Sequence, residues 1–421
     1  MRSCLLILLC YGHLFIVQAQ SRTDTMLQNL LQREGSPALK HILQCPDSFR
    51  YQLIYTQIDR DADNIPHFKN YYLDVDPNKY YNPASTVKLP IAVLALEKLH
   101  ELNIPGLTGN TPMLTDSAWQ GQEKVYTDST AENGLPSVYH YIKRVFLISD
   151  NDAYNRLYEF VGQQRIHERL WGMGYKDVRI VRRFMPLTEE ENRHTNPLRF
   201  VENGRLIYAQ PAAYDTLMFD YSRQVTIGQG YLDKNDRLVF SPMDFTKHNN
   251  FPLEDLQRML QSVLFPASVA ASARFHLTKE DQQFLYRYMS QYPSETLWPK
   301  YDTTEYYNSY TKFFFFKDGR QNIPSYMRVF NKAGWSYGFL TDAAYVVDFK
   351  HKVEFMLTGN IYVNRDGILN DNKYEYDEEG YPFFREIGEI IYQYELQRGK
   401  KYLPNLQQFK INYQEQGQGN R

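Results

Sequence analysis

Cysteine is scarce in this sequence, which contains three cysteines among 421 residues. Cys4 and Cys10 lie within the first twenty residues, so that removal of this stretch would leave Cys45 alone. An intrachain disulfide is then excluded, even in an exported protein that would be permitted to form one. We therefore expect the stability of the mature chain to come from its hydrophobic core.

Long hydrophobic runs are also missing. The longest stretch of this kind, from Leu5 to Val17, follows Arg2 and precedes Ala19, the pattern of an export signal with a small-residue cleavage site. A run of about thirteen residues is too short for a spanning helix, which needs roughly twenty apolar residues. We expect residues 1–19 to be removed as a signal peptide. The mature protein is then expected to be periplasmic or secreted and not to insert stably into the membrane.

Positive charge is not in excess. The chain has 47 Lys and Arg against 49 Asp and Glu, a net charge of -2. Nucleic-acid binding relies on basic patches, so no nucleic-acid partner is expected. The ten histidines are scattered without metal-binding spacing, and neither a metal nor another cofactor is expected. The ordinary balance of 43% hydrophobic and 23% charged residues is that of a globular protein, and the length suffices for one large domain or two modest ones. We expect a monomer.

The periodicity of apolar residues places strands near both ends of the chain and helices between them. The runs that predict strands are 50–58, 68–75, 327–332, 343–349 and 353–363. The runs that predict helices are 22–44 with a break at Gly35, 85–102, 137–147, 153–160, 253–264, 279–289 and 383–396. This order predicts an α/β (α+β) fold in which both chain ends build one antiparallel sheet covered by helices.

Ser85 and Lys88 stand at the beginning of the helix predicted for 85–102. Residues three apart are neighbours on a helix surface. A lysine amine in a partly desolvated place can lose its proton and then accept the proton of a serine hydroxyl. This pair predicts a serine nucleophile that needs no histidine, although Ser-x-x-Lys also occurs by chance as a helix cap followed by a surface lysine.

Two further motifs follow in order: Ser149-Asp150-Asn151 between two predicted helices, and Lys332-Ala333-Gly334 on a predicted strand. Together with Ser85-x-x-Lys88, the set resembles the Ser-x-x-Lys, Ser-Asp-Asn and Lys-Thr-Gly motifs of class A β-lactamases and penicillin-binding proteins. The resemblance covers roughly residues 22–184 and 327–396. It implies a β-lactamase/transpeptidase-like fold that forms a single catalytic domain over residues 20–421, and an acyl-enzyme mechanism.

The resemblance assigns a role to each matching residue. It implies that Ser85 attacks a carbonyl, that Lys88 takes or relays its proton, and that Ser149 bridges to the departing nitrogen. Asn151 is expected to hold Lys88 and the substrate amide. Lys332 and Gly334 are expected in the substrate-binding strand, with Lys332 opposite a substrate carboxylate.

The oxyanion hole implied by the resemblance is made by the backbone N–H groups of Ser85 and Trp335. Such donors contribute roughly 3 kcal/mol each to transition-state stabilisation in other enzymes.

Two positions depart from the family pattern. Ala333 replaces the hydroxyl residue of Lys-Thr-Gly, which predicts weaker or different recognition of a substrate carboxylate. Class A enzymes activate the deacylating water with a glutamate four residues before an asparagine. Here Glu189, Glu190 and Glu191 lie near Asn192, but none has that spacing.

The interval between Ser149 and Lys332 is far longer than in the family. This length predicts an insertion at about residues 186–326, formed of extra helices and a hairpin on the helical side of the fold. This insertion would form one side of the substrate cleft and could thereby select an unusual substrate. The polar tail from about residue 416 is expected to be loose.

Alternative interpretations remain open at this stage. Gly334-Trp335-Ser336-Tyr337-Gly338 matches the Gly-x-Ser-x-Gly nucleophile elbow, which requires a following helix. The acidic turn with Asp59, Asp61 and Asp63 partly matches a calcium loop, but Asn64 replaces its glycine.

The function that the sequence predicts best is a serine hydrolase that acts through an acyl-enzyme, with β-lactam hydrolysis as the first hypothesis. D-Ala-D-Ala peptidase or penicillin-binding activity is the alternative, and a binder of cell-wall peptide or β-lactam without turnover is a further one. In each case the expected partner is a small β-lactam or a cell-wall peptide.

Overall fold

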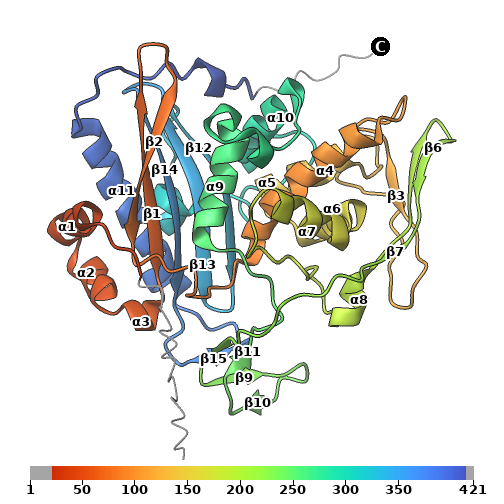
Figure 1. Cartoon of the computed structure of the whole chain (residues 1–421), viewed down its shortest axis with the longest axis horizontal. Helices are drawn as coiled ribbons and strands as arrows, with labels where there is room; N and C mark the ends of the chain where they lie inside the picture. The colour runs from red at the N-terminus through yellow and green to blue at the C-terminus, as the bar shows by residue number, and fades with distance from the viewer. Residues whose placement is uncertain (1–20, 414–421) are drawn as a thin grey trace, which may run out of the picture.

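A five-stranded antiparallel sheet forms the centre of the molecule (Figure 1). The computed structural model describes residues 21–413, so the expected signal peptide and the tail from residue 416 lie outside the described residues. The strand order is β12-β13-β14-β1-β2. The strands are β1 (Gln52–Arg60), β2 (Pro66–Leu73), β12 (Met327–Ser336), β13 (Phe339–Asp348) and β14 (Val353–Tyr362).

The two chain ends meet where β1 pairs with β14. Tyr55 lies opposite Leu357 in this antiparallel register. Alternate residues of β14 face opposite sides, with Phe355 and Leu357 in one apolar cluster and Met356 in another. The sheet is therefore covered on both faces, as the apolar character of its strands requires, and the predicted antiparallel sheet from both ends of the chain is confirmed.

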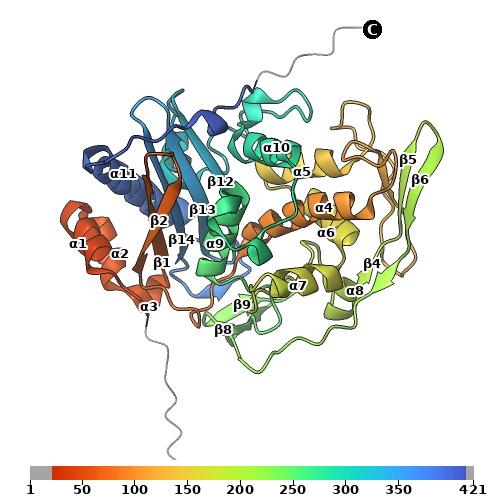
Figure 2. The same ribbon diagram turned by 45° about the horizontal axis from the view of Figure 1, so that its top comes forward.

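One face of the sheet is covered by helices from the two termini (Figure 2). These are α1 (Thr25–Glu34), α2 (Pro37–Gln44) and α11 (Tyr381–Gln397), with the short α3 (Pro46–Phe49) at the sheet's edge. The aromatic segment Phe313–Lys317 packs beneath α11, and the rings of Phe314 and Phe384 lie 4.9 Å apart. This stretch shows no helical or strand periodicity, because its consecutive phenylalanines are all buried between α11 and the sheet instead of lying on one side of a helix.

The other face carries the helical layer. It contains α4 (Lys88–Leu102), α5 (Val138–Leu147), α6 (Asn151–Val161), α7 (Gln163–Gly172), α9 (Leu253–Leu264) and α10 (Lys279–Ser290). Almost every residue of α4 from Lys88 to Leu99 is buried. A helix that is apolar on all sides belongs in the interior, and this burial places the first residue of α4, Lys88, inside the protein.

The segment from 186 to 326, predicted as an insertion, contains α8 (Glu189–Arg193), α9, α10 and a series of short strands. Those strands are β4 (His194–Thr195), β5 (Leu198–Glu202), β6 (Arg205–Gln210), β7 (Ala213–Tyr214), β8 (Thr226–Ile227), β9 (Gly230–Leu232), β10 (Leu238–Val239) and β11 (Met243–Asp244). Outside the segment, β3 (Met113–Thr115) pairs with β5 and β15 (Ile368–Leu369) pairs with β9. Within residues 21–413, no helix has the length and apolar character needed to cross a membrane.

Candidate active site

Ser85 lies in a short 3-10 turn, Ala84–Val87, that leads into α4. The α-helix itself begins at Lys88, three residues later than predicted, because residues 84–87 form the tighter 3-10 turn; its first residue, Ala84, has a positive φ of 44°. The Asn82 side chain accepts a hydrogen bond from the Ala84 N–H at 2.9 Å, and Thr86 donates two bonds to the Pro83 carbonyl. Strained backbone of this kind persists only where its surroundings hold it in place, and here it fixes the partly exposed Ser85 at the head of the helix.

Lys88 is fully buried and has only neutral hydrogen-bond acceptors. Its Nζ donates to Asn151 Oδ1 at 2.7 Å, to the Ser149 carbonyl, and to Ser149 Oγ at 3.4 Å. Burial lowers the pKa of Lys88 well below its ordinary value, the charge of Lys332 lowers it further, and Asp150 acts in the opposite direction. An amine in such surroundings is suited to accept a proton.

The turn that holds Lys88 is itself strained and braced. Ser149 has a φ of 62°, which is uncommon for a residue other than glycine. Asp150 Oδ1 caps α6 through the Ala153 N–H at 2.8 Å, while its other oxygen accepts Arg144 Nη2 at 2.8 Å. Because Arg144 pairs with Asp150, the negative charge nearest to Lys88 is largely compensated.

Lys332 joins the strand β12 to this turn. Its Nζ donates to Ser149 Oγ at 2.8 Å and to the Ala333 carbonyl at 2.7 Å. Burial lowers the pKa of Lys332 to about 7; Asp342 opposes this shift and Lys312 adds to it. The Ser149 hydroxyl therefore lies between two lysine amines, a position from which it can pass a proton between them.

Gly334 packs directly against the backbone of the predicted nucleophile. A Cβ at this position would lie 2.5 Å from the Ser85 nitrogen, 2.9 Å from the Thr86 nitrogen and 3.1 Å from the Pro83 oxygen. No side chain fits there without moving the backbone. The absence of a side chain thus lets β12 approach the 3-10 turn that carries Ser85.

The backbone of Trp335 faces the open edge of the sheet. β12 is an edge strand, and a two-residue turn at Tyr337 and Gly338, both with positive φ, connects it to β13. Such a turn is closed by a hydrogen-bonded pair, here Ser336 with Phe339, and hydrogen-bonded pairs alternate with non-bonded pairs. Trp335 with Leu340 is therefore a non-bonded pair, which leaves the Trp335 N–H available on the side from which Ser85 approaches.

A buried polar network that the sequence did not reveal lies close enough to Lys332 for its charges to act on the Lys332 pKa. Lys312 Nζ donates to Asn331 Oδ1 at 2.6 Å, and Asn331 donates to Asp342 Oδ1 at 2.8 Å. Burial lowers the pKa of Lys312 and raises that of Asp342. Ala333, whose side chain lies on the other face of the sheet from that of Lys332, is fully buried in an apolar cluster. A hydroxyl group at this position would need a hydrogen-bond partner there.

The three glutamates of the acidic loop are occupied elsewhere. Glu191 closes a capping box with Thr188, and Glu189 binds Lys247 at 2.8 Å. Glu190 accepts a hydrogen bond from Tyr214 at 3.3 Å. Asn192 is buried and accepts the Arg183 N–H at 2.8 Å, so its role is to shape the loop.

Apolar side chains from the loop before α8 lie against the lysine instead. The Phe184 ring centre is 5.1 Å from Lys88 Nζ, and Met185 lines a cavity together with Asn151. The loop is held by a buried ion-pair group in which Glu159 binds Arg156 at 2.9 Å and Arg183 at 2.7 Å. None of the three predicted glutamates is brought to the catalytic cluster.

The structure does not favour either alternative interpretation, the nucleophile elbow at Ser336 or the calcium loop at Asp59, Asp61 and Asp63. Ser336 ends β12 and is followed by a turn into β13, not by the helix that a nucleophile elbow requires. Asp61 accepts the N–H groups of Asp63 and Ile65 and so stabilises the hairpin loop, whereas Asp59 pairs with Arg398 at the end of α11.

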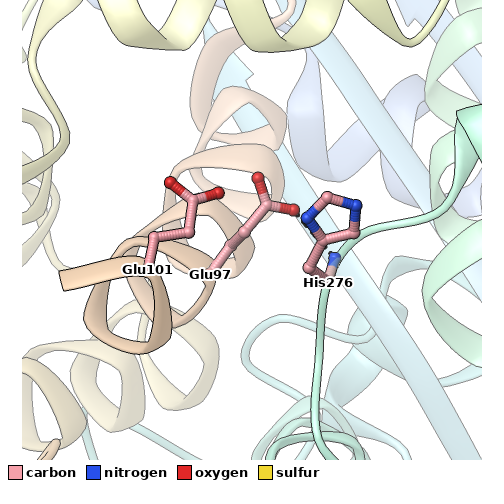
Figure 3. Close-up of side chains that lie close together, drawn as sticks. All are labelled: Glu97, Glu101 and His276. Carbon is pink, nitrogen blue, oxygen red and sulfur yellow. Dashed lines mark hydrogen bonds between the residues drawn. The ribbon is translucent and has the colours of Figure 1, made fainter. Parts of the chain in front are cut away.

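Figure 3 shows the one group of possible metal ligands within residues 21–413: Glu97, Glu101 and His276. Glu97 already binds Arg169 at 2.6 Å, and Glu101 pairs with Arg165. Arginine pairing supplies the positive charge at these carboxylates.

Residues 63–222 match the model of a family described as the beta-lactamase enzyme family. This part of the chain resembles β-lactamases. The β-lactamase-like region contains Ser85, Lys88, Ser149 and Asn151, whereas Lys332, Gly334 and Trp335 lie beyond it. No curated protein sequence matches the chain.

Several solved structures are similar to the chain at low sequence identity. A β-lactamase from Burkholderia phymatum has 14% identity and a TM-score of 0.48, with 87% of this chain and 100% of the other covered. A β-lactamase from Desulfarculus baarsii DSM 2075 has 14% identity and a TM-score of 0.47, with 87% and 98% covered. A variant of PBP-A, in an acyl-enzyme complex with penicillin G, has 13% identity and a TM-score of 0.46, with 87% and 96% covered.

Proposed function

We propose that this protein is a serine hydrolase that forms an acyl-enzyme at Ser85 with β-lactam-type amides and releases the product slowly. The observation that carries the proposal is the surroundings of Lys88, a fully buried amine whose acceptors are the neutral groups of Ser149 and Asn151. Its lowered pKa supports a role as the base that accepts the Ser85 proton.

The acylation step follows from these positions. Ser85 Oγ attacks the carbonyl carbon while Lys88 accepts the hydroxyl proton. The resulting oxyanion is stabilised by the N–H groups of Ser85 and Trp335, two donors that the close approach of Gly334 to the Ser85 turn supports. The C–N bond then breaks, and the departing nitrogen receives a proton through Ser149, which is hydrogen-bonded to both lysines.

Slow release follows from what lies beside Lys88. Hydrolysis of an acyl-enzyme needs a base that activates water, and general bases contribute typically 10²–10⁴-fold to rate. The candidates for this role, Glu189, Glu190 and Glu191, are turned to other partners, and Phe184 occupies the neighbourhood of Lys88. We expect the acyl-enzyme to accumulate, which favours penicillin-binding behaviour over efficient β-lactam hydrolysis.

The experiment is a stopped-flow assay with a chromogenic cephalosporin. We expect a burst equivalent to the amount of protein, followed by a steady rate at least roughly 10²-fold slower. Ser85→Ala is expected to abolish the burst, and Ser336→Ala, in which the competing serine is removed, is expected to retain it. Rapid turnover without a burst would contradict slow deacylation, and a burst that survives in Ser85→Ala would refute the assignment of the nucleophile.

A peptidase that cleaves a D-Ala-D-Ala terminus is the second candidate function. It is favoured by the position of β12 at the edge of the sheet, because an extended peptide can add to an edge strand through backbone hydrogen bonds. Release of D-alanine from an acylated D-Ala-D-Ala peptide by wild type but not by Ser85→Ala would support it. Absence of release from any such peptide would leave β-lactams as the better substrate class.

A further inference from the structure

A cavity of about 430 Å³ opens beside the catalytic cluster. Asn82 and Asn151 line one part of it, and these residues hold the Ser85 turn and Lys88, respectively. Ser336 and Tyr337, which follow Trp335 on β12, line another part. The volume lies in the range of pockets that bind small molecules, so a substrate acylating Ser85 has room to place a side chain here.

The lining of this cavity is positively charged. Its charged side chains are Arg182 and Arg183, and no carboxylate is among its lining residues in the described part of the chain. Arg183 forms an ion pair with Glu159 and donates hydrogen bonds to two backbone carbonyls. Arg182 therefore carries the charge that the lining leaves uncompensated.

Arg182 is held in place by uncharged groups. Its backbone N–H donates to Asn249 Oδ1 at 3.0 Å, and its guanidinium donates to His248 Nε2 at 2.5 Å. Burial lowers the pKa of His248 to about 3, so the imidazole is neutral at ordinary pH and accepts the arginine's hydrogen bond without adding a charge of its own. Arg182 is thus oriented, partly buried and, among residues 21–413, without a carboxylate in ion-pair contact.

We propose that Arg182 recognises a carboxylate on the acyl side of the substrate. A guanidinium binds carboxylates through two parallel hydrogen bonds, and such charge-assisted bonds are among the stronger ones. Lys332 lies on the strand side in contact with Ser149 and does not line this cavity. The protein therefore has one cation near the departing group and a second one for the acyl side chain, which selects substrates with two negative charges.

This inference rests on the proposed function and is tested with a matched substrate pair. Benzylpenicillin and carbenicillin differ by one carboxylate on the acyl side chain. The ratio of their second-order acylation constants, carbenicillin over benzylpenicillin, is measured in wild type, Arg182→Gln and Lys247→Gln. Lys247 is a nearby exposed cation that pairs with Glu189 and lies outside the cavity lining, so its removal controls for long-range charge.

We expect Arg182→Gln to lower this ratio by roughly 10- to 100-fold, the range for a lost charge-assisted bond. Arg182→Lys should retain part of the preference, because it keeps the charge but loses the bidentate geometry. Lys247→Gln should leave the wild-type ratio unchanged. A ratio in Arg182→Gln equal to that of wild type, or an equal fall in Lys247→Gln, would overturn the proposal.

A second measurement separates this proposal from the proposed function. If neither penicillin modifies wild type, the acyl-enzyme mechanism has failed, and the subsite is then tested by NMR titration of the protein with phenylmalonate and phenylacetamide. Weaker phenylmalonate binding in Arg182→Gln, with phenylacetamide binding unaffected, would support the anion subsite on its own. Equal phenylmalonate binding in wild type and Arg182→Gln would refute it.

Discussion

Replacing Gly334 by alanine tests how the nucleophile and the oxyanion hole are held together. The added Cβ would lie 2.5 Å from the Ser85 nitrogen and 2.9 Å from the Thr86 nitrogen. Both are backbone atoms, so relief requires the Ser85 turn or β12 to shift. Overpacking of this kind costs typically 1–3 kcal/mol in the free energy of unfolding.

The expected loss of activity is larger than the loss of stability. A shift between Ser85 and Trp335 separates the two N–H donors of the oxyanion hole, and loss of one such donor slows other enzymes by roughly 10²–10³-fold. At about 2.1 cal/mol/K of unfolding entropy per residue, the stability cost lowers the Tm of this chain by only about 1–4 °C. We expect Gly334→Ala to fold and to acylate at least roughly 10²-fold more slowly, measured by intact mass over time and by thermal unfolding.

Gly359→Ala is the matched control for this experiment. Gly359 lies in β14 of the same sheet, and its Cβ would be 3.2 Å from a Leu53 methyl group and 3.3 Å from the Gln52 oxygen. It should lose stability without a comparable loss of acylation. A Gly334→Ala protein that acylates as fast as Gly359→Ala would refute the argument that this glycine positions Ser85.

Three further predictions concern charge. Acylation by an anionic β-lactam should fall as pH rises through about 7, the value to which burial lowers the Lys332 pKa, because the protonated fraction of the free enzyme then drops about tenfold per pH unit. Lys332→Arg should remove this alkaline fall in a pH profile of kcat/KM, and a fall that persists would assign it to another group. Glu159→Gln should destabilise the fold by roughly 3–5 kcal/mol in a denaturant titration, since it leaves Arg183 buried without its carboxylate and removes one of the carboxylates that pair with the buried Arg156, which keeps Asp152; a change below about 1 kcal/mol would contradict this. Glu189→Gln, Glu190→Gln and Glu191→Gln should each leave the lifetime of the acyl-enzyme within about twofold of wild type, because their carboxylates bind other partners, and a single variant with a much longer lifetime would identify a deacylating base.

The sheet and the first contacts of the site were predictable because local patterns specify them. Strand-like runs rich in apolar and β-branched residues define β1, β2, β13 and β14 to within a few residues, and the apolar run after Lys88 defines α4. The order of the three short motifs correctly indicated that Lys88, Ser149, Asn151 and Lys332 come together. These motifs are short, but the first two stand at the beginnings of helices and the third lies within β12, so backbone geometry fixes the directions of their side chains.

What the sequence did not reveal depends on contacts between distant segments. Nothing in the local sequence distinguishes Lys312 from a surface lysine. In the folded protein it is buried, donates a hydrogen bond to Asn331 and lies close enough for its charge to lower the Lys332 pKa. The later start of α4 reflects the 3-10 turn Ala84–Val87. This turn begins with a positive φ at Ala84, a conformation that sequence patterns assign to glycine or asparagine. The acidic loop contains three glutamates that could serve as a general base, but Glu191 instead forms a capping box with Thr188.

The positive cavity was also hidden in the sequence. Arg182 and His248 are far apart in the chain, and only the folded arrangement shows that one is a cation without a carboxylate in ion-pair contact among residues 21–413 and the other is neutral. Charge counting over the whole chain cannot detect such a site, because an overall balance conceals local imbalance.

The most direct test of the central claim is the intact mass of the protein over time after addition of benzylpenicillin, with peptide mapping of any adduct. Opening of the lactam ring keeps the leaving nitrogen attached, so the adduct should equal the whole mass of the penicillin. We expect this adduct on the peptide that contains Ser85, stable enough to be isolated, and absent from Ser85→Ala and Lys88→Met. An adduct on any other residue, or undiminished acylation in Lys88→Met, would contradict the account.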